Sequence, residues 1–383
     1  MLNAASSLYI HFPFCLSKCA YCDFFSVPAA RNAREQFDGY LSALAGGISR
    51  QNREGILAPL KTIYIGGGTP SLLTPRDIES LLARIDREAG IESGAEITLE
   101  ANISGVSAGF LRGMAQAGIT RLSAGLQSFN RQSLSAVHRR RAPESFMETL
   151  SAWRGTLSID MIAGLPFETE ESFATGLETA LCCSPHHVSL YALTVEEHTP
   201  LARDITAKRV PYDKDFADLL WIFGRDFLES RGYAQYEVSN FALPGYECAH
   251  NIAYWRLQSY AGAGAGAVGT LFFADGRGER RAVSHDIGGY IRGSERIETE
   301  ILDKKTVMFE YVMMGLRMRE GICGRDFFAR FGEPLEEKIG ARVGVFASWL
   351  QKGMAEHTGS RYALTREGIL FLNDFLIDES LIM

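Results

Sequence analysis

Strand-like and helix-like stretches alternate from residue 8 to residue 193, and this alternation limits the possible folds more than any other feature. Between the apolar runs lie helical patterns near Ala33–Ser49, Pro75–Glu88, Ala108–Ala117, Pro143–Trp153 and Glu170–Leu181. The runs themselves, bounded by glycine, proline or polar residues, predict strands at Leu8–Phe12, Thr62–Ile65, Glu96–Glu100, Arg121–Gly125, Ser158–Ile162 and His187–Leu193. Strands joined by crossover helices form a parallel sheet, whose functional residues belong at the carboxyl ends of the strands.

Six such units are too few for a complete eight-fold barrel, so we expect an α/β fold with an open, partial barrel. Beyond Leu193 the alternation stops, and Tyr212–Ser230 reads as an amphipathic helix. Near the C-terminus we expect helices at Lys304–Arg319 and Pro334–Gly340, a strand at Tyr362–Thr365 and a last helix at Arg366–Phe375. This order suggests a small winged-helix-like domain. We therefore divide the chain into residues 1–200, 201–285 and 286–383.

Composition restricts the classes of function. Of the 383 residues, 46% are hydrophobic and 22% are charged, which is ordinary for a globular protein with a sizeable core. The net charge is −7 and the basic residues gather only at Arg139–Arg141, so we expect no nucleic-acid partner. No run approaches the length of a membrane span, and an odd number of cysteines, seven, does not suggest a disulfide framework. We therefore expect a cytoplasmic protein.

Cys15, Cys19 and Cys22 form a C-x3-C-x2-C array just after the first predicted strand. Thiolates this close together converge on one soft metal centre, and sulfur ligands favour iron–sulfur clusters or zinc. Three cysteines are one too few for a closed zinc site, whereas a [4Fe–4S] cluster held by three cysteines leaves one iron open to another ligand. The alternatives are three unrelated thiols or a zinc site with a fourth ligand from elsewhere, for which the candidates are His11, Cys248 and His250.

With Tyr21 directly before its last cysteine, the array resembles the signature of radical S-adenosylmethionine (SAM) proteins. In that superfamily the open iron binds the amino and carboxylate groups of SAM. One electron from the cluster then splits SAM into methionine and a 5′-deoxyadenosyl radical. The resemblance implies a [4Fe–4S] cluster, SAM and an electron donor. It also predicts a partial (β/α)6 radical SAM barrel with a smaller, mostly helical C-terminal domain.

Polar residues at the predicted strand ends extend this resemblance. A glycine run follows the second strand, Glu100 closes the third, Gln127 follows the fourth and Asp160 lies in the fifth. Taken singly, each of these strand-end residues is better explained as a helix cap or a solvated turn residue. In order along the chain, they resemble the SAM-binding positions of the oxygen-independent coproporphyrinogen III dehydrogenase family. The resemblance assigns cofactor binding to Tyr9, Tyr21, Gly67, Gly68, Thr69, Glu100, Gln127, Arg139 and Asp160.

The second half contains the sequence His250-Asn251-x-x-Tyr254-Trp255. On residue types alone, a histidine beside two aromatics is more often a packed, hydrogen-bonded residue than a ligand. The same arrangement suits a flat macrocycle, because imidazole ligates haem iron and aromatic faces pack on the ring. With YEVSNFA upstream and a glycine-rich stretch downstream, the motif resembles the HemW branch of the same family, which consists of haem chaperones. The resemblance implies haem as cargo and His250 as a haem-binding residue.

Two differences separate the chain from the dehydrogenase of that family. Phe24 stands where the dehydrogenase has a further cysteine, and only eight residues precede Tyr9, where the dehydrogenase has a long extension. We therefore expect a haem chaperone that inserts haem into client haemoproteins. The alternative is an oxygen-independent coproporphyrinogen III oxidase that decarboxylates coproporphyrinogen III to protoporphyrinogen IX. A radical RNA-modifying enzyme is a third hypothesis, disfavoured by the net charge, and a homodimer is left open.

Overall fold

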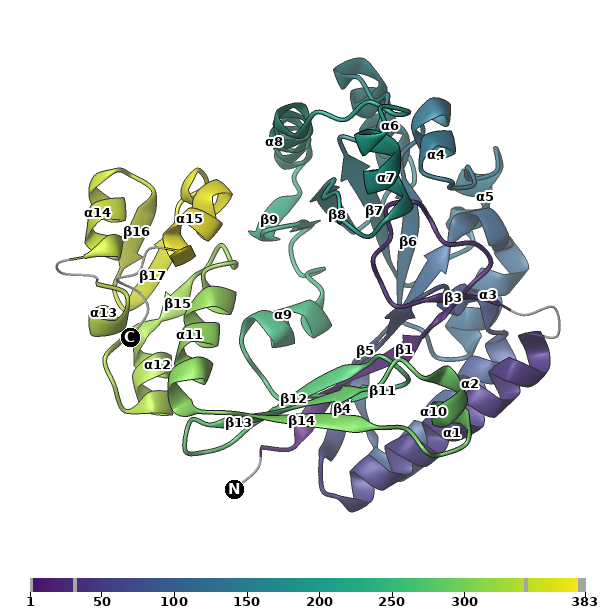
Figure 1. Cartoon of the computed structure of the whole chain (residues 1–383), viewed down its shortest axis with the longest axis horizontal. Helices are drawn as coiled ribbons and strands as arrows, with labels where there is room; N and C mark the ends of the chain where they lie inside the picture. Colours follow the sequence, from purple (N-terminus) through teal and green to yellow (C-terminus); the bar gives the residue numbers. More distant parts are fainter. Residues whose placement is uncertain (1–2, 30–32, 341–343, 378–383) are drawn as a thin grey trace.

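A mixed sheet of twelve strands curves around an open interior (Figure 1). The protein is described by a computed structural model that covers residues 3–29, 33–340 and 344–377. The strand order is β14-β13-β12-β11-β1-β4-β5-β6-β7-β8-β10-β9. From β11 through β8 all neighbours are parallel, and the strands outside this run pair antiparallel. The parallel part confirms the predicted partial barrel.

All six predicted strands are present. They are β1 (Ala5–Phe12), β4 (Leu57–Gly67), β5 (Ile91–Asn102), β6 (Arg121–Gln127), β7 (Thr156–Ala163) and β8 (His187–Ala192). The helices between them cover the outer face of the sheet (Figure 1) and are α1 (Ala33–Arg53), α2 (Pro75–Ala89), α3 (Ala108–Gln116), α4 (Arg131–Ala136), α5 (Phe146–Ser151) and α6 (Glu170–Leu181). The helix expected at Pro143–Trp153 is shorter, because Pro143 lies in a turn closed by a hydrogen bond from Phe146 N to its carbonyl.

Side chains of the parallel strands alternate between the outer core and the interior of the barrel, as the period of two residues in a strand requires. On β4, Ile63 and Ile65 belong to the core that packs beneath the outer helices. Thr62 and Tyr64 lie on the opposite face, where Tyr64 contacts Glu100 of β5. The interior is therefore lined by polar side chains.

The second half of the chain extends this sheet at both ends. Strands β9 (Ala234–Glu237) and β10 (Asn240–Ala242) follow β8. At the other end β11 (Tyr260–Ala263) pairs with β1 and is followed by β12 (Val268–Phe272), β13 (Gly278–Val283) and β14 (Ile297–Leu302). None of these strands was predicted, because sequences such as YAGA and GERRAV lack an apolar run. Four helices lie in this region: α7 (Pro200–Thr206), α8 (Lys214–Ser230), which confirms the expected amphipathic helix, α9 (Ala249–Trp255) and α10 (Ile287–Ile291).

A separate hydrophobic core, which includes Val307, Phe327 and Phe346, defines the C-terminal domain. Its helices are α11 (Lys304–Gly315), α12 (Gly324–Phe331), α13 (Leu335–Lys338), α14 (Val345–Gln351) and α15 (Leu372–Ile377). Its small sheet has the order β15 (Ile322–Cys323), β17 (Arg361–Leu364), β16 (Ala355–Thr358), and β17 is the predicted strand. The expected last helix is instead a 3-10 turn, Gly368–Phe371, that leads into α15.

The C-terminal domain lies beside the gap between the two ends of the curved sheet (Figure 1). Met318 forms a bridge with Glu237 of β9, and Arg319 N donates to Tyr236 O at 3.0 Å. This pairing explains why α11 ends at Gly315, before the predicted end at Arg319. In the part of the chain that the structure describes, no helix is long and apolar enough to cross a membrane.

Candidate cofactor site

The three cysteines of the array lie in one loop at the carboxyl end of β1. Cys15 is buried on the short strand β2 (Phe14–Cys15), which pairs with β3 (Val27–Pro28), and Cys19 and Cys22 are half-buried. Backbone bonds fix the ends of the loop, with Ala29 N donating to Cys15 O at 2.8 Å and Cys22 N to Cys19 O at 3.1 Å. Burial raises the pKa of Cys22, and the neighbouring thiols Cys19 and Cys15 add to this rise.

Two side chains from other parts of the barrel donate hydrogen bonds to the sulfur atoms. Thr69 Oγ1 lies 3.4 Å from Cys15 Sγ, and Arg139 Nη1 lies 3.6 Å from Cys19 Sγ. Hydrogen bonds of this kind stabilise the negative charge of cluster thiolates and set the potential of an iron–sulfur cluster. The donor set therefore fits a cluster bound through three cysteines.

The candidates for a fourth zinc ligand have other partners. His11 shares hydrogen bonds of 2.9 Å with Tyr9 OH and Phe25 O, and Cys248 donates to Glu96 at 3.4 Å. Among residues 3–29, 33–340 and 344–377, no group of three or more His, Cys, Asp or Glu side chains is placed around one metal ion, and this holds for Cys15, Cys19 and Cys22 as well.

The glycine run packs directly against the cysteine loop. Gly68 N donates to Phe12 O and Thr69 N to Phe14 O, each at 2.8 Å. A Cβ atom on Gly68 would lie 2.6 Å from Phe14 O, so glycine is required by the close approach of the two chains. The backbone amides of residues 67–69 all have protein partners, so they are not free to bind a ligand in this conformation. A ligand ammonium group needs acceptors, which the neighbouring carboxylate supplies.

That carboxylate is Glu100, which lies at the carboxyl end of β5 beside the glycine run. Tyr64 OH donates to Glu100 Oε1 at 2.9 Å, and Gly67 N donates to Oε2 at 3.1 Å. Burial raises the pKa of Glu100 to about 7, with a further contribution from the negative charge of Asp160. A carboxyl group with this pKa gains or loses its proton near neutral pH, and a bound cation would favour its ionised form.

The other predicted SAM-binding residues surround the same strand ends. Asp160 accepts hydrogen bonds of 2.9 and 3.0 Å from Ser123 Oγ, and its own burial raises its pKa. Arg139 Nη2 donates to Gly125 O at 2.7 Å, while its Nη1 donates to Tyr21 OH at 3.4 Å. The structure thus joins Tyr21 and Arg139 to the cysteine loop.

Gln127 has an unusual backbone. Its φ of 69° is in the left-handed region, which costs energy for a residue other than glycine, and the pairing of β6 with β7 shifts register between Gly125 and Gln127. A register shift of this kind re-aims a side chain next to a functional site. Gln127 therefore occupies a strained position at the same edge of the sheet as Glu100 and Asp160.

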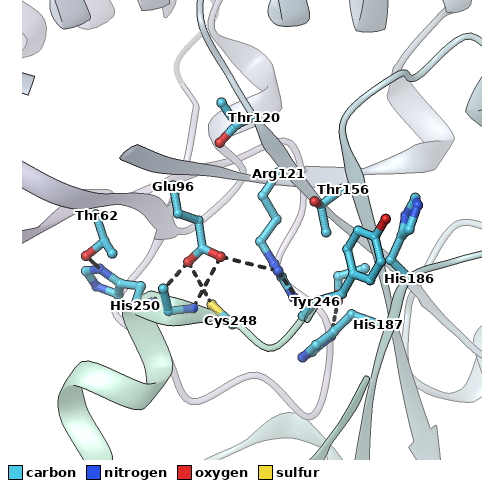
Figure 2. Close-up of polar contacts among 12 residues, drawn as sticks. Thr62, Glu96, Thr120, Arg121, Thr156, His186, His187, Tyr246, Cys248 and His250 are labelled. Carbon is cyan, nitrogen blue, oxygen red and sulfur yellow. Dashed lines mark hydrogen bonds and ion pairs between the residues drawn. The ribbon is translucent and has the colours of Figure 1, made fainter. Parts of the chain in front are cut away.

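His250 is not among these residues. It lies on α9, in the segment 246–255, which we call the motif segment, and this segment crosses the interior of the barrel (Figures 1 and 2). Glu96 accepts hydrogen bonds from His250 N at 3.0 Å and from Ala249 N at 3.2 Å. Arg121 donates to Tyr246 O at 3.0 and 3.1 Å and forms an ion pair with Glu96 at 3.3 Å. Polar side chains of the strands therefore fix the motif segment in place.

Both ring nitrogens of His250 are hydrogen-bonded. Nδ1 lies 2.8 Å from Thr62 Oγ1, and Nε2 lies 2.8 Å from Tyr254 OH. The side chain is 1% exposed, and burial lowers its pKa to about 3, so the imidazole is neutral. In this conformation His250 has the contacts of a packed, hydrogen-bonded residue.

Four residues that contact the motif segment or Glu100 were missed by sequence analysis, namely Thr62, Tyr64, Glu96 and Arg121. The signal that points to them is the alternation within the strands, since polar residues recur at every second position in T62-Y64, E96-T98-E100, R121-S123 and H187-S189-Y191. A period of two in a strand places them on one face, which here is the interior.

Comparison with known proteins agrees with this geometry. The radical SAM superfamily matches residues 9–180, and the HemN C-terminal domain matches residues 302–371. The solved structure of coproporphyrinogen III oxidase (HemN) from Escherichia coli, described as a radical SAM enzyme, has a TM-score of 0.83 and 20% identity and covers 100% of this chain and 91% of that chain. At this identity the likeness shows the fold. The chain is a radical SAM protein with a HemN-type C-terminal domain.

Two curated relatives identify the branch. The protein named heme chaperone HemW from Haemophilus influenzae is 36% identical over 380 residues, which cover 97% of this chain and 96% of that protein. The Escherichia coli protein of the same name is 34% identical over 381 residues, which cover 97% of each. The chain belongs to the HemW family.

Proposed function

We propose that this protein is a haem chaperone, which binds haem and passes it to client haemoproteins with the help of a [4Fe–4S] cluster and SAM. The observation that carries the proposal is the 36% identity to a protein named heme chaperone over nearly the whole length of both chains. Phe24, where the dehydrogenase has a cysteine, supports the same choice, and its side chain is 71% exposed beside the cysteine loop.

In this proposal Cys15, Cys19 and Cys22 hold the cluster. When bound, the cluster and SAM supply the electron transfer and radical chemistry of the superfamily, with the electron coming from an external donor. The residues that would bind SAM are Tyr9, Tyr21, Gly67, Gly68, Thr69, Glu100, Gln127, Arg139 and Asp160. Ionised Glu100 and Asp160 are the acceptors of this set, for an ammonium group or for ribose hydroxyls, and Arg139 keeps a positive charge beside Cys19.

Haem binds at the motif segment. His250 offers the neutral imidazole that ligates haem iron, once one ring nitrogen exchanges its hydrogen bond to Thr62 or Tyr254 for the metal. The indole Nε1 of Trp255 is buried and has no partner among the described residues, and the Arg317 guanidinium lies 5.8 Å from the Trp255 ring centre. Trp255 and Arg317 are therefore donors suited to a carboxylate such as a haem propionate.

The proposal is tested by haem transfer. Anaerobically reconstituted protein loaded with one equivalent of haem is mixed with an apo-haemoprotein, and the client's Soret band is followed with and without SAM. We expect transfer faster than from an equal amount of haem on albumin. Two results together would overturn the chaperone function in favour of the decarboxylase: no transfer above the albumin control, and formation of protoporphyrinogen IX when coproporphyrinogen III, SAM and a reductant are supplied.

A further inference from the structure

The motif segment reaches the SAM-binding edge of the barrel through one side chain, Tyr64. The Tyr64 and His250 rings are in contact in a tilted arrangement, with their centres 5.2 Å apart and their planes inclined by 30°. At its other end Tyr64 donates its phenolic hydrogen to Glu100 at 2.9 Å. His250, Tyr64 and Glu100 thus form a continuous line from the motif segment to the residue that accepts Gly67 N.

The position of His250 is determined from three directions. Thr62 forms a hydrogen bond with Nδ1 and Tyr254 forms one with Nε2. Glu96 accepts a hydrogen bond from the backbone N–H. Thr62 precedes Tyr64 by two residues on β4, so both side chains leave the strand on the same face. If the His250 ring moves to bind a ligand, the Tyr64 ring therefore loses its contact with it.

The hydrogen bond from Tyr64 favours the ionised form of Glu100, since it lowers a pKa that burial raises. The titratable groups that face Glu100 are Tyr64 on β4, Tyr9 on β1, Asp160 on β7 and Tyr191 on β8. Burial raises the pKa of all three tyrosines well above neutrality, so they stay protonated in the range where Glu100 titrates. Of these groups, Tyr64 is the one that contacts both Glu100 and His250.

We propose that His250 is a positioning residue for the SAM site. By its ring contact it keeps the Tyr64 hydroxyl in its hydrogen bond to Glu100, and it thereby couples haem binding at the motif segment to the affinity of the protein for SAM. The proposal rests on the proposed function, because it assumes that Glu100 binds SAM and that the motif segment binds haem. Coupling between two sites is reciprocal, so haem weakens SAM binding to the same extent that SAM weakens haem binding.

The experiment measures the dissociation constant of SAM between pH 6 and pH 9 for anaerobically reconstituted protein, with iron content checked for every variant. Tyr64→Phe keeps the ring and removes the donor, and His250→Gln keeps polar contacts and removes the ring. We expect each to weaken SAM binding about tenfold at pH 7 and to move the pH of half-maximal affinity upward. The double variant should be no weaker than Tyr64→Phe alone, because both changes act through the same contact.

His187→Gln is the matched control. His187 is also buried and shares hydrogen bonds of 2.7 Å with Ser158 and 2.9 Å with Tyr236. The Tyr236 hydroxyl accepts Cys248 N at 3.2 Å, so His187 supports the motif segment, but in the described part of the chain it has no hydrogen bond or ring contact with Tyr64 or Glu100. We expect this variant to keep the wild-type pH profile. A His250→Gln profile equal to the wild type, or one matched by His187→Gln, would overturn the coupling.

Haem titration of the same variants separates the two claims. Normal haem binding by the wild type with an unchanged SAM profile in His250→Gln overturns the coupling and leaves the chaperone function standing. A shifted SAM profile in a protein that does not bind haem overturns the assumed haem site, and with it the coupling to haem, although Tyr64 and His250 then still position Glu100.

Discussion

The hydroxyl of Ser128 donates a hydrogen bond of 2.9 Å to the buried carboxyl of Glu168, forty residues further along the chain. The other oxygen of Glu168 accepts Gly164 N at 3.0 Å. Glu168 therefore ties the loop after β6 to the loop after β7, next to the strained residue Gln127. Burial raises the pKa of Glu168 to about 7, so its proton is lost near neutral pH.

The raised pKa of Glu168 predicts how stability depends on pH. The folded protein binds this proton more tightly than the unfolded chain does, and this difference stabilises the folded state. The stabilisation is complete below pH 4.5 and is lost as pH rises through about 7. We expect Glu168→Gln, which resembles the protonated acid, to gain stability relative to the wild type above pH 7. The shift from 4.5 to about 7 sets an upper limit on the order of 3 kcal/mol. Urea unfolding at pH 5.5 and pH 8.5 measures the difference in the free energy of unfolding between Glu168→Gln and the wild type. An equal difference at both pH values would contradict the raised pKa of Glu168.

Replacement of any one cysteine of the array is expected to abolish the cluster. Cys15→Ala, Cys19→Ala and Cys22→Ala each leave two thiolates, too few to hold a cluster that keeps one iron open. After anaerobic reconstitution, the broad absorbance of the cluster and the bound iron should fall to background. Cys182→Ala is the control, since Cys182 is exposed at the end of α6. Unchanged iron in all three variants would refute the ligand assignment.

Arg139 is expected to raise the reduction potential of the cluster. Its guanidinium donates to Cys19 Sγ, and a positive charge near a cluster favours the reduced, more negative state. Arg139→Met should therefore lower the midpoint potential, by tens of millivolts, in a redox titration followed by electron paramagnetic resonance. Arg140→Met, which changes an exposed neighbour, should leave the potential where it is. A potential that falls equally in both variants would indicate a general effect of charge.

Arg225 is expected to hold the C-terminal domain on the barrel. It is 1% exposed, and its Nη1 donates to Arg366 O at 3.0 Å across the boundary between α8 and the C-terminal domain. Arg225→Met should lower the free energy of unfolding by about 2 kcal/mol, because a part-buried carbonyl loses its partner and a buried charged side chain is removed from its contacts. Arg231→Met, at an exposed ion pair of 3.9 Å, should cost less than about 1 kcal/mol. Chemical denaturation compares them, and equal losses would contradict a special role for Arg225.

The sequence was sufficient to predict the half-barrel and the location of the cysteine loop. Apolar runs separated by helical patterns identify parallel strands, and parallel strands bring their carboxyl ends to one edge. The same reasoning could not find β11 and β13, because their sequences, YAGA and GERRAV, contain no apolar run and the strands with which they pair are set by the fold. Strand propensity depends strongly on such context.

The position of His250 was also beyond the sequence. Residue types alone favour a packed, hydrogen-bonded histidine, and the structure confirms this. They do not identify its partners Thr62 and Tyr254, which belong to a distant strand and to its own helix. Only the fold shows that Thr62 and Glu96 face the motif segment across the interior. The alternation of Thr62 and Glu96 with apolar residues is visible in the sequence, but the sequence does not show that these residues contact the motif segment.

The most direct test of the account is an anaerobic haem titration of reconstituted protein, wild type beside His250→Ala, followed by the Soret band. The account predicts saturation at one haem per chain in the wild type and weaker binding in His250→Ala, since a nitrogen ligand is lost from the motif segment. Absence of a shifted Soret band in both proteins would contradict it, because a chaperone must bind its cargo.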